Sequence, residues 1–236
     1  MKKKLGLIAG TALLALSVTA AHAQVVVTST PGSSFNTAAL SGFTTNGAQQ
    51  DGMEVTVWFS NGSSETIVWA ATGATTGGVT GTGWSLTLGG DSFNTPFVMT
   101  AGDVQITGFS MNGRPGVGTI FDIVLDPTLS PGSQRGRPFE LFGSLPAGIE
   151  TINVEYTDQL SVGGVFYGDL YTVMDVDFAG RFLSNSTLSF ISDTDNSRFD
   201  SPIVPTPPNG VPEPGTLLLI GSGLLGLALR RRRLAA

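Results

Sequence analysis

Apolar and polar residues alternate in short runs along most of the chain between residues 24 and 200. The clearest run is residues 53–59, where apolar side chains recur at every second position, as in a strand with one buried face. Asn61-Gly62 follows, and because both residues tolerate positive φ we expect a type I′ hairpin turn, with the returning strand at residues 65–70. Further runs of the same kind occupy residues 84–88, 104–106, 121–125, 152–156, 172–178 and 188–190. About ten short strands without a helical period predict an all-β fold, an antiparallel β-sandwich or jelly roll.

Segments rich in Gly, Ser, Thr and Pro separate these runs. Residues 72–83 and 129–136 have this composition and are predicted to be loops. Residues 201–210 contain four prolines and are predicted to form a stiff, extended linker. The body is therefore assigned to residues 24–200 as one β-domain, which is long enough to bury a core of its own.

Residues 1–23 have the three parts of an export signal. Three lysines open the segment, residues 5–18 are apolar, and Ala21 and Ala23 supply the small residues that a signal peptidase recognises. A transmembrane helix is the alternative, but the apolar stretch is shorter than the roughly 20 residues that a span needs. We therefore expect signal peptidase to cut before Gln24 and to remove this signal peptide.

Residues 211–236 combine an extended motif, an apolar segment and a basic end. The parts are, in order, Pro212, Glu213 and Pro214; the apolar residues 216–229; and Arg230, Arg231, Arg232 and Arg233. As a helix the apolar part reaches about 21 Å, whereas the hydrocarbon core of a bilayer is about 30 Å thick. The arginines stay on the cytoplasmic side, so the body lies outside. An accessible motif beside a short, poorly fitting span indicates a processing signal.

This order of motif, apolar segment and arginine cluster resembles the PEP-CTERM sorting signal of Gram-negative bacteria. The resemblance implies export across the inner membrane, transient insertion of the apolar helix, and recognition of Pro212, Glu213 and Pro214 by an exosortase, a membrane-embedded cysteine transpeptidase. It also implies removal of the tail and a final place at the cell surface or in a biofilm matrix that contains exopolysaccharide. A permanent C-terminal anchor is the alternative.

Without its two ends the chain has a restricted set of chemical groups. Residues 24–210 hold five arginines and seventeen acidic residues, a formal balance of −12, with no lysine, histidine or cysteine. Catalytic units of the Ser-His-Asp or Cys-His kind, zinc or copper sites built from His or Cys, and lysine Schiff bases are therefore excluded. The negative charge also argues against nucleic-acid partners. Carboxylates remain, either for catalysis or for holding a hard cation such as calcium.

Oxygen-bearing side chains recur near the end of the body. Asp193, Asp195, Ser197 and Asp200 could converge on one calcium ion, although the stretch lacks the glycine and the distal glutamate of an EF-hand. A solvated acidic turn is the alternative. No other cofactor is expected.

Two further groups of residues are candidates for glycan chemistry. Asp175 and Asp177 share one strand face, with Asp169 on the same predicted hairpin, and a glycosidase needs two carboxyl groups about 5–10 Å apart. Alternating acids on the solvent face of a sheet are the alternative. Trp58 and Trp69 could stack on sugar rings, but we expect them to cover a second core face of the sandwich.

Three functions remain open. The preferred one is a non-catalytic structural protein, secreted or attached to the cell surface within an extracellular matrix. The second is a carbohydrate-binding module that holds exopolysaccharide through calcium or exposed aromatic side chains. The third is a carboxylate-dependent glycan hydrolase. We therefore expect an exported protein that is not an enzyme.

Overall fold

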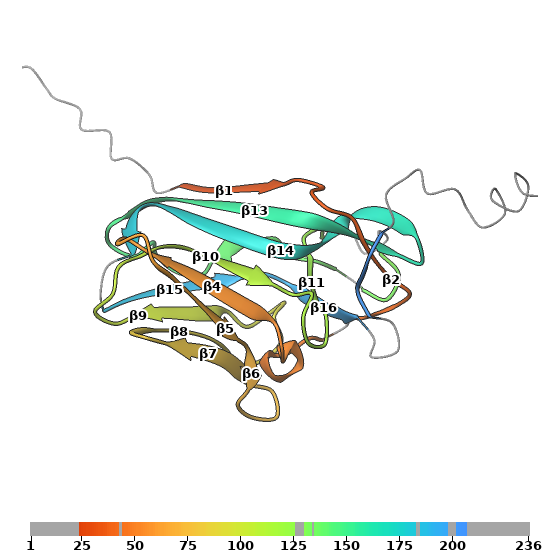
Figure 1. The fold of residues 1–236 in the computed structure, drawn as a ribbon, viewed down its shortest axis with the longest axis horizontal. Helices are drawn as coiled ribbons and strands as arrows, with labels where there is room; N and C mark the ends of the chain where they lie inside the picture. The colour runs from red at the N-terminus through yellow and green to blue at the C-terminus, as the bar shows by residue number, and fades with distance from the viewer. Residues whose placement is uncertain are drawn as a thin grey trace, which may run out of the picture.

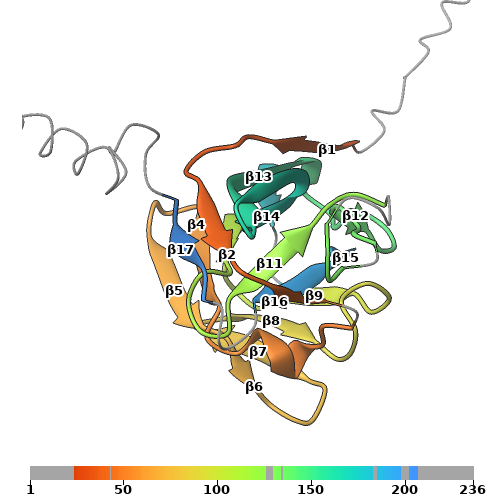
Figure 2. The ribbon, with the colours of Figure 1, turned by 90° about the vertical axis from the view of Figure 1, so that its right-hand side faces the viewer.

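The structure of the protein is a computed structural model that describes residues 24–42, 44–125, 130–133, 135–182, 185–197 and 202–206, with the backbone alone at 181 and 182. These residues form two β-sheets that pack against each other (Figures 1 and 2), so the predicted all-β class is confirmed. The helical element among them is one 3₁₀ turn, η1, at Gly47–Gln50. No helix long and apolar enough to cross a membrane occurs in this described part of the chain. The predicted signal peptide and apolar sorting helix lie outside it.

The larger sheet has eleven strands and curls into a half-barrel. Its strands are β1 (Gln24–Ser29), β2 (Phe35–Thr37), β3 (Leu40–Ser41), β4 (Glu54–Phe59), β5 (Ser64–Val68), β10 (Ile106–Asn112), β11 (Thr119–Asp122), β13 (Ile149–Val162), β14 (Val165–Phe182), β16 (Thr194–Ser197) and β17 (Val204–Pro205). The main path runs β17-β2-β13-β14-β10-β4-β5. Beside it, β1 pairs with β13, β11 pairs with β14 and β16, and β3 pairs with β16.

The smaller sheet has six strands and is wholly antiparallel. Its strands are β6 (Ala70–Ala71), β7 (Gly77–Gly81), β8 (Trp84–Leu88), β9 (Phe97–Ala101), β12 (Glu140–Leu141) and β15 (Ser186–Ile191), in the order β12-β15-β9-β8-β7-β6. On β8 the side chains of Trp84, Leu86 and Leu88 are buried and those between them are not. The predicted alternation of residues 84–88 is thereby confirmed.

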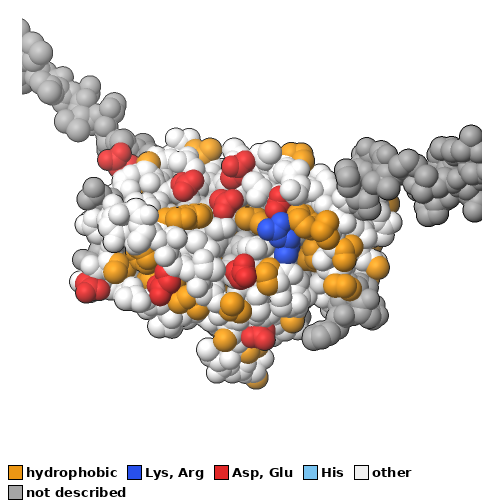
Figure 3. Space-filling view, viewed as in Figure 1, with side chains coloured by type: hydrophobic (Ala, Val, Ile, Leu, Met, Phe, Trp, Pro, Cys, Tyr) orange, Lys and Arg blue, Asp and Glu red, His pale blue; other side chains and the backbone are white. Residues whose placement is uncertain are grey.

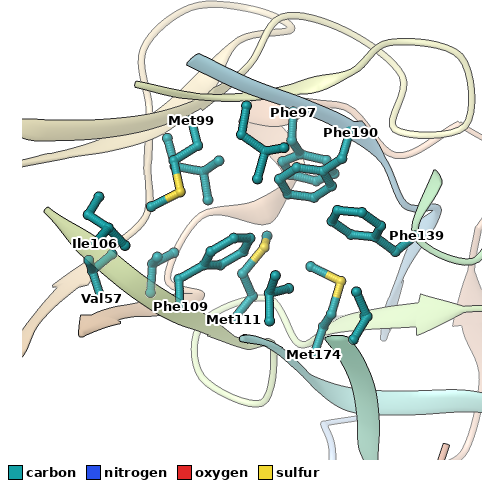
Figure 4. Close-up of a cluster of buried hydrophobic side chains, with 14 of the residues drawn as sticks. Val57, Phe97, Met99, Ile106, Phe109, Met111, Phe139, Met174 and Phe190 are labelled. Carbon is teal, nitrogen blue, oxygen red and sulfur yellow. The ribbon is translucent and has the colours of Figure 1, made fainter. Parts of the chain in front are cut away.

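Most buried apolar side chains form one cluster between the two sheets. Val55 and Val57 enter it from β4, fully buried, as the period of two in residues 53–59 predicts. Figure 4 shows the rings of Phe97, Phe139 and Phe190 lying against one another within this cluster. The Phe190 ring centroid lies 5.2 Å from that of Phe97 and 4.7 Å from that of Phe139. Since the chain has no cysteine, this apolar burial carries its stability without disulfides.

The hairpin of β13 and β14 is much longer than the short strands that the sequence predicts. The two strands have 14 and 18 residues, and Gly163 and Gly164 turn the chain between them with positive φ angles of 59° and 83°. Both β1 and β2 pair with β13 in parallel, which is an exception at this edge to the antiparallel sheets that the sequence predicts and that most of the strands form. Alternation indicates which face of a strand is buried but not the direction of its partner.

Residues 72–83 are not all loop, because they contain β7. Gly77 on this strand lies so close to its neighbours that an added Cβ would be 2.1 Å from the Gly47 carbonyl oxygen and 2.4 Å from Trp69 Nε1. The abundance of glycine led to the prediction of a loop. On β7, however, glycine is required because the strand passes close to another backbone.

The Asn61-Gly62 hairpin is present, but its turn differs from the prediction. Gly62 has a φ of +84°, whereas Asn61 does not adopt a positive φ, as a type I′ turn would require. The Asn61 Oδ1 atom accepts hydrogen bonds from the Ser63 N–H (2.9 Å) and hydroxyl (2.7 Å). The Phe59 N–H donates to the Ser63 carbonyl oxygen at 2.9 Å, which closes a three-residue loop with glycine in the left-handed conformation.

The predicted linker, residues 201–210, is partly built into the body. Val204 and Pro205 form β17, which pairs with β2 at the edge of the larger sheet. Proline is tolerated on an edge strand because its missing N–H faces away from the ladder. The chain therefore pairs with the larger sheet through β17 a few residues before the sorting segment begins.

A second, smaller apolar cluster lies apart from the main core. It contains the buried side chains Leu40, Ile120, Leu160, Val162 and Leu170. Gly132 lies against it, because an added Cβ there would be 3.1 Å from the Leu40 Cβ atom. The segment around Gly132 thus covers this side of β11. Asp122 faces the same side, because it lies two residues after Ile120 on the strand.

Candidate functional site

Four aspartates are buried where β11, β14 and β16 meet. Asp122 ends β11, Asp169 lies on β14, Asp193 precedes β16, and Asp195 lies within β16. The Asp122 N–H donates to the Asp193 carbonyl oxygen at 3.3 Å, and the register of β11 with β16 pairs Ile120 with Asp195. The exposed fractions of the four aspartates are only 0–4%. The carboxyl groups are therefore removed from bulk water.

Neighbouring groups supply some of the hydrogen bonds that these carboxyls need. Ser133 Oγ donates to Asp122 Oδ2 at 2.8 Å, and the Val124 N–H donates to Asp122 Oδ1 at 3.3 Å. Ser92 Oγ donates to Asp193 Oδ1 at 3.2 Å. These bonds tie the loop that contains Ser133 and the segment that contains Ser92 to the two carboxyl groups.

For Asp195 the Ser133 hydroxyl is near but does not reach hydrogen-bonding geometry. Both of its carboxyl oxygens are buried without a hydrogen-bond partner, and so is Asp169 Oδ1. The Asp195 carboxyl lies against Gly42, where an added Cβ would be 2.1 Å from Oδ1. An ionised carboxylate that is buried without a partner is strongly destabilising. The group therefore requires either a proton or a cation.

The four aspartates hold protons more tightly than free aspartate does. Burial raises the pKa of Asp193 to about 8 and that of Asp122 to about 6, and it raises the pKa of Asp195 well above its usual value. Burial raises the pKa of Asp169 as well. Neighbouring carboxylates add to the rise in all three, hydrogen bonds from Ser133 and Ser92 lower the pKa values of Asp122 and Asp193, and the nearby Ser133 hydroxyl lowers that of Asp195. Within the described part of the chain, no basic side chain is among the groups that shift these pKa values.

The predicted calcium ligands are only partly brought together. Asp193 and Asp195 belong to the buried cluster, whereas the Ser197 hydroxyl donates to the Val117 carbonyl oxygen at 2.9 Å. Asp200 lies outside the described residues. As their side chains stand, no three His, Cys, Asp or Glu residues of the described ranges are arranged so that they could hold a metal ion. Calcium binding by the set predicted from sequence stays a prediction.

Sequence reasoning does not single out Asp122 or Ser133. The signal for Asp122 is an acid inside the apolar run of residues 120–124, because a charged residue at a core position is rare unless it is paired. Ser133 gives no signal of this kind, since it lies in a segment rich in Gly, Ser and Pro that reads as an ordinary loop.

Asp175 and Asp177 lie side by side on the outer face of the larger sheet. The register places Asp175 between Glu155 on β13 and Ser110 on β10. Burial raises the pKa of Asp175, and the carboxylates of Asp177 and Glu155 add to the rise. The predicted pairing of Asp175 with Asp177 is therefore present, on an open sheet face.

Asp169 does not join this pair. Tyr171 and Met174 both pack into the main core, so the buried side of β14 changes between them and the alternation is interrupted. Asp169, before this change, faces the buried cluster, whereas Asp175, after it, faces outward. The prediction that Asp169 accompanies Asp175 is wrong for this reason.

The two candidate tryptophans have different environments. Trp69 is 1% exposed, its Nε1 donates to the Gly47 carbonyl oxygen at 2.8 Å, and its ring meets that of Phe97 edge-on at 6.0 Å. Its predicted place in the core is confirmed. Trp58 is half-buried on the outer face of β4, opposite Gly108 on β10, so it does not cover a second core.

A pocket of about 590 Å³ opens beside the hairpin of β4 and β5. Phe59, Glu65, Thr82 and Asp103 contribute to its lining. The Thr82 N–H and the Trp84 indole donate to Glu65 Oε2 at 3.0 and 2.7 Å, and these bonds lower the pKa of Glu65. A general acid for glycoside hydrolysis needs a raised pKa, so Glu65 does not suit that role.

Two arginines of the described residues are engaged in ion pairs at the surface. Arg114 Nη1 lies 2.6 Å from Asp158 Oδ2, and the Arg114 guanidinium lies over the Phe35 ring at 4.7 Å. Arg137 pairs with Glu140. On the face shown in Figure 3, carboxylates are spread over the surface and cationic side chains occupy one small area. This acidic surface agrees with the charge balance of the sequence.

The residues of the two predicted processing signals lie mostly outside the described residues. They are Ala21 and Ala23 at the signal-peptide end and Pro212, Glu213, Pro214, Arg230, Arg231, Arg232 and Arg233 at the other end. Gln24, the first residue after the predicted cut, begins β1.

Comparison with known proteins identifies one segment of the chain. The family model of the PEP-CTERM protein-sorting motif matches residues 210–233. The match covers the motif, the apolar segment and the arginines, so the resemblance inferred from these residues is confirmed. Neither the curated proteins nor the solved structures include a match to this chain.

Proposed function

Because this chain carries a PEP-CTERM protein-sorting motif at residues 210–233, we propose that it is an exosortase-processed structural protein of the cell surface or biofilm matrix. The motif is the observation that carries the proposal, since it implies an exported protein that an exosortase processes. The body then reaches its destination without its tail. It acts there through its folded surface and not through catalysis.

The arrangement of the body supports this route. Gln24 begins β1, so cleavage before it removes none of the described residues. At the other end β17 stops at Pro205, shortly before the sorting motif, and removal of the tail leaves both sheets complete. The lack of histidine, cysteine and lysine after cleavage, together with the lowered pKa of Glu65 in the pocket, supports a non-catalytic role.

Replacement of Pro212, Glu213 and Pro214 together by alanine is expected to prevent removal of the tail. Proline disfavours a helical conformation both for itself and for the residue before it, so alanine at these positions is expected to remove the extended motif that the sequence predicts. Intact mass of the protein recovered from membranes and from culture medium measures the outcome. The variant should retain residues up to Ala236 in the membrane fraction, while the unchanged protein should lose its tail.

The matched control replaces Pro207 and Pro208, which precede the motif, by alanine. This control should be processed like the unchanged protein, because it alters proline content without touching the motif. Equal processing of the motif variant would contradict the proposed route.

Glycan binding at Trp58 is a second candidate function. The register places Trp58 opposite Gly108, and Gly108 opposite Asp177 on β14, so one face of the indole borders a position without a side chain. A half-buried aromatic ring beside carboxylates on an open sheet face offers a sugar both a stacking surface and hydrogen-bond acceptors. Trp69 has no part in this, since it lies in the core.

Trp58→Ala is expected to weaken binding to exopolysaccharide extracted from the producing cells by at least about tenfold, a loss of about 1.4 kcal/mol. The ring is only partly buried, so the melting temperature should change little. Affinity electrophoresis in gels that contain the polysaccharide measures the binding. Val68→Ala is the control, because Val68 is 55% exposed on the neighbouring strand of the same face. Equal retention of all three proteins would remove this candidate.

A further inference from the structure

We propose that the buried aspartate cluster is a calcium-binding site, in which Asp122, Asp193 and Asp195 hold one ion beneath the segment of Ser133. This inference goes beyond the proposed function and does not depend on it. The ligand set also differs from the one predicted from sequence, since Asp122 and Ser133 take the places of Ser197 and Asp200.

Among the described side chains, no ion pair offsets the negative charge of this cluster. Four carboxyl groups are buried together, at most 4% exposed, at the meeting point of three strands. Of the arginines whose side chains are described, Arg114 and Arg137 form their ion pairs elsewhere, with Asp158 and Glu140, and Arg135 is exposed. Buried carboxylates are normally paired with a cation or bound to a metal ion. A divalent cation would supply the missing positive charge.

Asp195 also points to a ligand, independently of its charge. It is 0% exposed, and neither of its oxygens accepts a hydrogen bond. Buried polar atoms without a partner are rare in proteins and often mark an absent water or ion. Gly42 leaves room for this carboxyl, because any Cβ at that position would collide with it. The free oxygens of Asp195 are the feature of the cluster that points to a ligand.

The surrounding atoms have the chemistry that calcium prefers. Calcium binds six to eight oxygen atoms in flexible geometry, whereas magnesium demands a near-ideal octahedron and retains water. Three carboxyl groups provide up to six oxygens, and the Ser133 hydroxyl, 2.8 Å from Asp122 Oδ2, provides a neutral one. These carboxyl groups do not surround a common point in this structure. Binding therefore requires rotation of the carboxyl side chains.

Calcium titration of the exported protein, recovered from the cell and stripped of metal with a chelator, tests the proposal. Calorimetry at about pH 7.5 should detect about one ion per chain, and saturating calcium should raise the melting temperature by about 5–10 °C. Magnesium at the same concentration should have a much smaller effect. Absence of both calcium heat and a temperature shift would overturn the proposal and leave a cluster of protonated acids.

Asp195→Asn distinguishes this site from calcium bound elsewhere on the acidic surface. The amide keeps the shape of the side chain and removes its charge, so calcium affinity should fall at least about a hundredfold, while the melting temperature without metal should stay level or rise. Asp103→Asn, at an exposed position, should behave like the unchanged protein. Asp122→Asn is a second test with the same expectation, should the first variant fail to fold. An unaltered calcium response in a folded variant of either residue would refute the assigned ligands.

Discussion

Replacement of Phe190 by alanine is expected to lower the free energy of unfolding by about 3–5 kcal/mol. The Phe190 side chain is fully buried, and its ring stacks on those of Phe97 and Phe139 and lies 5.6 Å from that of Phe109. These rings come from both sheets, so the truncation opens a cavity where the two layers meet. Stacked neighbours that are themselves fixed by packing cannot collapse to fill it. Urea denaturation followed by tryptophan fluorescence measures the loss.

Phe142→Ala is the matched control for this prediction. Phe142 directly follows β12, is 55% exposed, and its N–H donates to the Ser189 carbonyl oxygen, a bond that the substitution leaves intact. The same chemical change should therefore alter stability by no more than about 0.5 kcal/mol. A loss below about 1 kcal/mol in the Phe190 variant would contradict the position of this ring at the centre of the core.

Stability without divalent cations is expected to fall as the pH rises from about 4 to about 8. Aspartates of the unfolded chain lose their protons near a pKa of about 3.9, whereas burial raises the folded-state pKa of Asp193 to about 8 and of Asp122 to about 6. Asp169 and Asp195 are shifted in the same direction. The folded protein therefore binds more protons than the unfolded chain in this window, and the free energy of unfolding decreases with pH until Asp193 has titrated.

The expected decrease is on the order of 8 kcal/mol, because the folded-state pKa exceeds the unfolded value by about 4 for Asp193 and by about 2 for Asp122, and each unit corresponds to about 1.4 kcal/mol. Urea denaturation at a series of pH values, with a chelator present, measures it. Asp193→Asn should flatten the curve, since it removes a group that titrates over the whole window, and Asp103→Asn should leave it unchanged. A free energy of unfolding that is constant or rises over this range would show that the four aspartates are not buried as described.

Strands were predictable where apolar and polar residues alternate along the strand itself. In residues 53–57 and 84–88 every second side chain is buried, and this period of two follows from strand geometry whatever the partner strand is. Residues 97–101 show the same alternation, although they are not among the predicted strands. The glycine-rich strand β7 could not be recognised, because its glycines serve the close approach to Gly47 and Trp69, far away in sequence.

The candidate sites also divide into those formed by residues close together in the sequence and those formed by distant segments. The sorting motif was readable because its parts are consecutive in the chain and act as a linear signal. Asp193 and Asp195 were also recognised as a pair, from their spacing. Their association with Asp122 was not, because it depends on the pairing of β11 with β16 across some seventy positions of sequence. Trp58 and Trp69 look alike in sequence, and only their packing distinguishes a surface ring from a core ring.

The amino-acid sequence by itself determined the strand-rich body, the acidic charge and the sorting motif, since each depends only on residues that are near one another in the chain or on composition. The tertiary structure decided which aspartates face inward together, where the buried side of β14 changes, and that β1 and β2 run parallel to β13. The physical reason is that burial and pairing depend on contacts between distant segments. Such contacts form only when the two sheets close over their core.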